Sequence, residues 1–134
     1  MLENATRVRI HGCRFVANDG NGILLSHAVR NSSISRNEIS GCGDTPLLLI
    51  GSADLMDGTH GTQPWHNTLA HNYVHHWGVW GRQAAGYFEG LAGANNVSFN
   101  VFHDGPRAGA NFNDGFGDVA FQISRLLIDQ SIDR

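Results

Sequence analysis

The chain has 134 residues, of which 41% are hydrophobic, and this suits one domain over residues 1–134 with an ordinary core. Only 16% of the residues are charged, the formal net charge is -3, and all nine basic residues are arginine. A negative chain without a clustered basic face is not expected to bind nucleic acid. Because no run of 18 apolar residues occurs, we expect no membrane span.

The first residues and the cysteines give expectations about the cellular compartment of the protein. No basic start followed by an apolar run is visible, so no signal peptide is predicted, and an extracellular location is expected only if a longer parent carries an export signal. Two cysteines are too few for a disulfide framework. Cys13 and Cys42 also fall in different phases of the repeat described next, so we expect free thiols.

A six-residue frame recurs along the chain: an apolar residue, two variable residues, Asn, one variable residue and a second apolar residue. Its copies begin at residues 10, 34, 69, 97 and 123, which places them 24, 35, 28 and 26 residues apart. The first copy has Cys13 in the Asn place, and the last copy has Leu126 there. Recurrence at this length is typical of repeat architectures.

Each frame predicts a short strand, a bend and a second strand. A third strand is expected after a turn residue that stands nine positions beyond the Asn place, at Gly22, Pro46, Gly81 or Gly109. In the third unit Gly86 competes with Gly81 for this role, which implies a small insertion. Residues 51–64 are rich in Gly, Asp and Thr and predict a protruding loop.

Short strands without a helical period between them predict an all-β parallel solenoid of about four to five coils. Asn37, Asn72 and Asn100 would then stack as a ladder of hydrogen-bonded side-chain amides. The segment 118–134 is atypical, because its apolar spacing also fits an amphipathic helix. The likeness of 123–128 to 34–39 favours a fifth strand.

On the Asn frame, and on phrases such as 100–105 (NVFHDG) followed by Gly109, the chain resembles the right-handed parallel β-helix repeat proteins of the pectin-lyase-like superfamily over about residues 7–128. The resemblance implies a right-handed coil and a polysaccharide partner, with lyases that use an Arg or Lys base and Ca²⁺, or hydrolases that use clustered Asp. The chain has no Lys and no paired-Asp motif typical of the polygalacturonase-like members. Because family members usually have more coils and capped ends, we expect a fragment or truncated member whose uncapped coils can associate end to end.

Polar residues follow the third and fourth frames. Stacking of equivalent positions predicts His75 beside His103 and His76 beside Asp104, with Arg107 in the following turn. We interpret His75 or His103 as a proton-transfer group, Asp104 as an orienting group and Arg107 as a clamp for a uronate. The alternative is that these His and Asp side chains only hydrogen-bond the turn backbone.

Other residues are candidates for substrate binding. Trp77 and Trp80 lie in a Gly-flanked turn, where they are either stacking platforms for sugar rings or packed under the 51–64 loop. Glu89 and Asp114 are candidate carboxylates, since glycoside hydrolysis uses two. Asp and Asn oxygens make Ca²⁺ binding possible without a recognisable loop. Five histidines within 60–76 form no closed zinc set of the usual kind, so no metal ligands are assigned.

Together these patterns predict a carbohydrate-active β-helix that acts on or binds a polysaccharide, either as a lyase or as a glycoside hydrolase. The alternative is a non-catalytic structural or binding solenoid that lacks a complete active site. An enzyme predicts loss of turnover without unfolding when Arg107 is replaced by Ala. A structural solenoid predicts no functional loss there.

Overall fold

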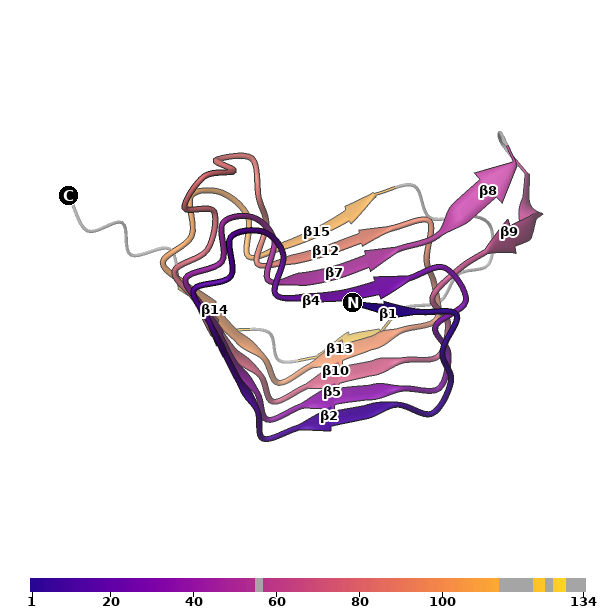
Figure 1. Cartoon of the computed structure of the whole chain (residues 1–134), viewed down its shortest axis with the longest axis horizontal. Helices are drawn as coiled ribbons and strands as arrows, with labels where there is room; N and C mark the ends of the chain where they lie inside the picture. The colour runs from indigo at the N-terminus through magenta and orange to yellow at the C-terminus, as the bar shows by residue number, and fades with distance from the viewer. Residues whose placement is uncertain (55–56, 114–121, 125–126, 130–134) are drawn as a thin grey trace.

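The computed structural model describes residues 1–54, 57–113, 122–124 and 127–129, and within these ranges the chain is all-β (Figure 1). The strands form three five-stranded parallel sheets and one antiparallel hairpin. The first sheet contains, in spatial order, β1 (Leu2–Glu3), β4 (Ile23–Ser26), β7 (Leu47–Ile50), β12 (Tyr87–Gly90) and β15 (Ala110–Asn113). The second contains β16 (Gln122–Ser124), β13 (Asn96–Ser98), β10 (Thr68–Ala70), β5 (Ser33–Ser35) and β2 (Arg9–His11). The third contains β17 (Leu127–Asp129), β14 (Val101–His103), β11 (Tyr73–His75), β6 (Glu38–Ser40) and β3 (Arg14–Val16).

The chain visits the sheets in rotation, so each strand pairs with the equivalent strand one repeat away. Leu69 of β10, for example, pairs with Ile34 on one side and with Val97 on the other. Figure 1 shows the strands of the first and second sheets stacked one above the next. The predicted all-β parallel architecture is confirmed, and the arrangement is compatible with a β-solenoid. No helix in the described part of the chain has the length and apolarity needed to cross a bilayer.

The boundaries resolve two alternatives that the sequence left open. The strand of the third unit begins after Gly86 rather than Gly81, and Tyr87 pairs with Leu47, so the expected insertion lies between β11 and β12. Residues 122–124 and 127–129 are strands that pair with β13 and β14. The fifth-strand prediction is therefore confirmed over the helical alternative.

The predicted Asn ladder lies at the bend between the second and third sheets. Asn72 Oδ1 accepts hydrogen bonds from the backbone N of Asn37 (3.1 Å) and from its Nδ2 (3.0 Å). Asn72 Nδ2 donates to Ile34 O (2.9 Å) and to Asn100 Oδ1 (3.0 Å). The ladder continues downward to the backbone N of Cys13, which donates to Asn37 Oδ1 (2.9 Å). The three Asn side chains are buried, so each amide satisfies backbone groups that have no water to bind.

A second ladder, which the sequence analysis did not predict, lies five residues before the first in each repeat. The backbone N of Ser32 donates to Asn67 Oδ1 (3.0 Å), and the backbone N of Asn67 donates to Asn95 Oδ1 (2.9 Å). Asn67 Nδ2 donates to the same Asn95 oxygen (3.0 Å). The pattern N-x4-N, at 67–72 and again at 95–100, was its signal in the sequence.

The bends repeat a left-handed backbone conformation at equivalent positions. The residue just before the first ladder has positive φ in each repeat: Gly12, Arg36, His71 and Phe99. The residue just after the third-sheet strand does so as well: Ala17, Gly41, His76 and Asp104. The recurrence shows that the bend geometry belongs to the repeat rather than to one residue type.

Apolar side chains from all three sheets fill the interior. The fully buried members include Leu25, Ile34, Ile39, Leu47, Leu49, Leu69, Val74, Val97 and Phe102. The 51–64 segment contains the hairpin β8 (Ser52–Asp54) and β9 (Asp57–Thr62), which projects from one corner of the stack (Figure 1). Both cysteines are free thiols, as predicted.

Candidate functional site

One cluster of polar side chains lies where β11 and β14 end. We call it the histidine cluster, and it comprises Tyr73, His75, His76, His103 and Asp104. His75 pairs with His103 across the two strands, and their rings stack with centroids 5.2 Å apart and planes 4° apart. His76 Nε2 lies 3.6 Å from Asp104 Oδ2. Both neighbour relations predicted from the repeat are confirmed.

A chain of hydrogen bonds runs through this cluster. His103 Nδ1 lies 2.6 Å from Asp104 Oδ2, and His103 Nε2 lies 2.8 Å from the Tyr73 hydroxyl. An ionised carboxylate only accepts, so His103 Nδ1 donates to Asp104, and in the neutral form of the ring Nε2 then accepts the proton of the Tyr73 hydroxyl. Tyr73 is 45% exposed, and sequence reasoning missed it. Its signal was strand alternation, because Tyr73 stands two residues before His75 and hence on the same face.

His75 is the most enclosed imidazole of the cluster. Burial, and secondarily the neighbouring His76 and His103, lower its pKa, while Glu38 acts in the opposite direction. The Glu38 carboxylate lies 3.6 Å from His75 Nε2. His75 Nδ1 and His76 Nδ1 are 2.7 Å apart, so one of these two nitrogens donates and the other accepts. The ring that accepts is neutral.

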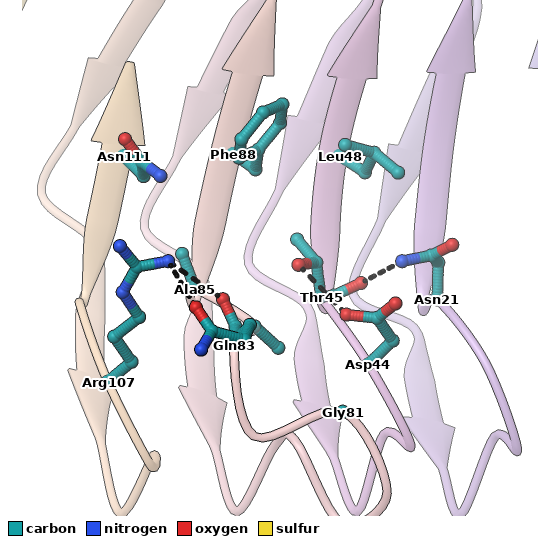
Figure 2. A pocket seen from close by; sticks show the side chains of 11 residues that line it. Asn21, Asp44, Thr45, Leu48, Gly81, Gln83, Ala85, Phe88, Arg107 and Asn111 are labelled. Carbon is teal, nitrogen blue, oxygen red and sulfur yellow. Dashed lines mark hydrogen bonds between the residues drawn. The ribbon is translucent and has the colours of Figure 1, made fainter. Parts of the chain in front are cut away.

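Arg107 lies in a separate hollow and not among the described contacts of the histidine cluster. Its Nη1 donates to the backbone O of Gln83 (3.3 Å) and to Gln83 Oε1 (3.2 Å). The hollow has a volume of about 320 Å³ and lies on the outer face of the first sheet (Figure 2). We call it the Arg107 groove. Its lining residues include Asn21, Asp44, Thr45, Leu48, Gln83, Phe88, Arg107 and Asn111.

Successive strands contribute to the floor of this groove. Leu48 of β7, Phe88 of β12 and Asn111 of β15 are paired neighbours, and Figure 2 shows them side by side. Asn21 Nδ2 donates to Thr45 O (3.0 Å), which fixes one end of the polar wall. The groove therefore combines a guanidinium, several amides, a carboxylate and an apolar floor.

The two candidate tryptophans lie in different environments. Trp77 is only 4% exposed and packs edge-on against Phe102, with Gly105 so close that a Cβ there would lie 2.0 Å from the indole. This placement corrects the expectation of a surface platform, because a ring with that little exposure has no face for a sugar. Trp80 is 74% exposed and packs beside Gly43, whose neighbour Asp44 lines the groove. Trp80 itself does not line the Arg107 groove, but the next residue, Gly81, does.

Glu89 is buried and takes part in the interior rather than in an outer face. Its carboxylate accepts from the Tyr87 hydroxyl (2.7 Å) and from Asn95 Nδ2 (3.0 Å). It thereby supplies the acceptor that ends the second ladder, which corrects its expected role as a substrate contact. Burial, and next the Glu89 charge, raise the pKa of Tyr87 well above its usual value. Asp114 lies outside the described residues.

Within the described ranges, no three His, Cys, Asp or Glu side chains converge in a way that would hold a metal ion. Comparison of the chain with protein families, curated proteins and solved structures gives no significant match.

Proposed function

We propose that this protein is a right-handed parallel β-helix of four to five coils, similar to the pectin-lyase-like proteins, and that it binds a polysaccharide along the Arg107 groove. The observation that carries the proposal is the composition of that groove. Sugars present hydroxyl groups at their edges and apolar C–H faces, and the groove offers amides beside the half-buried Phe88 and Leu48. A pocket with an apolar floor and a few polar groups is typical of small-molecule and cofactor sites.

Arg107 favours an acidic polymer. A guanidinium can donate two parallel hydrogen bonds to one carboxylate, and this geometry selects a uronate over a neutral sugar. The two hydrogen bonds to Gln83 hold the Arg107 side chain at the groove wall. Trp80, the residue before the groove-lining Gly81, adds an exposed aromatic ring for sugar stacking.

The test is binding of polygalacturonate and of an uncharged glucan, measured by affinity electrophoresis and calorimetry. Arg107→Ala is expected to weaken polygalacturonate binding by about tenfold, the usual range for losing one charge-assisted pair, and to leave glucan binding nearly unchanged. Trp80→Ala should weaken both. Arg82→Ala is the control for charge, because Arg82 is an exposed arginine between the groove-lining Gly81 and Gln83 but does not itself line the groove. Equal losses in the Arg82 and Arg107 variants would overturn the proposal, since they would mean unspecific charge attraction.

A non-catalytic structural solenoid is the second candidate. The observation favouring it is that Trp77 and Glu89, two of the residues predicted to bind substrate, serve the interior instead. This candidate predicts that no polysaccharide binds the folded protein and that Arg107→Ala changes nothing measurable.

A further inference from the structure

The histidine cluster contains the geometry of an activated nucleophile. Such sites place a nucleophile within hydrogen-bond reach of a base, and a third group orients that base. Tyr73, His103 and Asp104 meet these conditions at 2.8 Å and 2.6 Å. The His75 ring stacked on His103 restricts rotation of the imidazole. The polysaccharide groove described above uses none of these side chains.

The charges around Tyr73 indicate which electrophile suits it. Glu38 is paired with Arg14 (3.1 Å) and Asp104 is bound to His103, so neither carboxylate is available as the acid or nucleophile of glycoside hydrolysis. Both carboxylates add negative charge beside Tyr73 and disfavour an anionic reacting group such as a phosphate ester. A neutral carboxylic ester meets no such repulsion.

We propose that Tyr73, His103 and Asp104 form a second site that removes acyl groups from esters of sugar hydroxyls. The identity of the alcohol as a sugar rests on the proposed function, whereas the acyl-transfer chemistry rests on the cluster alone. Tyr73 and His103 are the catalytic residues, and Asp104 is a positioning residue that holds the imidazole in the tautomer whose Nε2 accepts a proton.

The reaction balances without any co-reactant other than water. The Tyr73 oxygen attacks the ester carbonyl carbon while its proton passes to His103 Nε2. The C–O bond to the alcohol breaks, and His103 returns the proton to the departing alkoxide. Water then attacks the acyl-tyrosine, gives a proton to His103 and releases the carboxylic acid, and the proton returns to the Tyr73 oxygen.

The chain offers an internal control for the first step, because it contains two tyrosines. The folded protein is incubated with p-nitrophenyl acetate, nitrophenolate release is followed, and acetylated peptides are mapped by mass spectrometry. Acetyl label is expected on Tyr73 and not on the buried Tyr87. Tyr73→Phe and His103→Gln should each lower release by about tenfold or more, in line with the loss of a nucleophile or a general base.

Persistent nitrophenolate release in Tyr73→Phe would overturn the proposal. Exposed imidazoles can attack activated esters directly, so release that persists in Tyr73→Phe would mean that a histidine reacts and Tyr73 does not. His71→Gln is the control: His71 is exposed at the bend before β11, stacks on Phe99 and lies outside the cluster, so the rate of this variant should match that of the parent protein. Circular dichroism spectra establish that each variant is folded.

The positioning role of Asp104 has its own readout. In Asp104→Asn the amide can donate to His103 Nδ1, which places the imidazole proton on Nε2 and removes the acceptor for Tyr73. We expect a slower rate and a changed pH–rate profile, together with a ¹⁵N NMR spectrum in which the protonated ring nitrogen has switched. An unchanged profile and tautomer would overturn this role.

The sugar part of the proposal is tested with an acetylated polysaccharide and an assay for free acetate. Acetate release that is lost in Tyr73→Phe supports it. No release from a polymer that still binds the protein would overturn the sugar-ester assignment. The groove proposal can fail separately. In that case the parent protein does not bind polysaccharide but still cleaves p-nitrophenyl acetate.

Discussion

At the residue scale, the face of the strand on which a side chain stands decides its role. Tyr73 and His75 alternate with the buried Val74 and therefore share the outer face of β11. Glu89 shares a face with the buried Tyr87 and therefore lies inside. Alternation along the strand therefore makes the Glu89 carboxylate an acceptor for the second ladder. It also leaves Tyr73 exposed beside the His103 imidazole.

His75 provides a pH prediction at this scale. Its folded-state pKa lies below the usual 6.5, chiefly through burial, so as the pH falls the unfolded chain takes up a proton at His75 before the folded chain does. The free energy of unfolding should therefore decrease as the pH falls from about 7 through the region below 6.5. Denaturant titrations over this pH range, with the parent protein and His75→Gln, measure the effect.

The groups that face His75 are Glu38, Tyr73, His76 and His103, and they stay in place in this variant. His75→Gln should flatten the pH dependence. The exposed His66→Gln should keep it, since His66 belongs to a different bend. The prediction is wrong if the free energy of unfolding depends on pH equally steeply in His75→Gln and His66→Gln.

At the scale of elements, the two Asn ladders hold the bends in register. Each amide oxygen accepts from the backbone of the preceding repeat, and each amide nitrogen donates to a backbone carbonyl of that repeat. Buried backbone groups at a bend have no strand partner, so the side-chain amides replace the sheet hydrogen bonds there. The ladders thus hydrogen-bond neighbouring repeats at the bends, as the paired strands do within the sheets.

Asn72→Ala tests the first ladder. The change leaves the backbone N of Asn37 and the carbonyl of Ile34 buried with fewer partners, and we expect a loss of about 2–4 kcal/mol in the free energy of unfolding. Asn113→Ala, at an exposed position, should cost less than about 0.5 kcal/mol. Both are measured by urea denaturation, and equal stabilities would contradict the role of the ladder.

Much of this element-level order was readable from the sequence. The Asn frame gave the strand pairs and the register, because a buried amide is needed at the same bend of every repeat. The second ladder was missed because its first place holds Ser32 rather than Asn, which breaks the motif. Burial of Trp77 was one of two alternatives left open, and its packing partners were not predicted. They depend on space left by Gly105 of the next repeat, a contact that spacing along the chain does not reveal.

At the scale of the whole molecule, the parallel stack is independent of the hairpin at its corner. β8 and β9 pair with each other, and among the described strands they contact no others. The end-to-end association expected from uncapped coils stays a prediction, which concentration-dependent sedimentation would test.

Replacing residues 53–61 by Asn-Gly tests this independence. The two-residue turn keeps Ser52 opposite Thr62, whose hydroxyl groups are hydrogen-bonded (2.9 Å). We expect a change of less than about 1 kcal/mol in the free energy of unfolding, because shortening a surface loop alters mainly its closure entropy. Thermal unfolding followed by circular dichroism measures it, and collapse of the stack would contradict the prediction.

The left-handed bends also lower the stability of this fold below what it could reach. Residues such as Ala17 and Ala94 hold φ values of 55° and 48°, a conformation that costs a residue with a Cβ roughly 1 kcal/mol or more. The chain already places Gly41 where Ala17 stands in the repeat before, so glycine suits the bend. Conformational strain is thus spread over many corners, and glycine substitutions at Ala17 and Ala94, which lie outside the histidine cluster and the Arg107 groove, offer a route to a more thermostable scaffold.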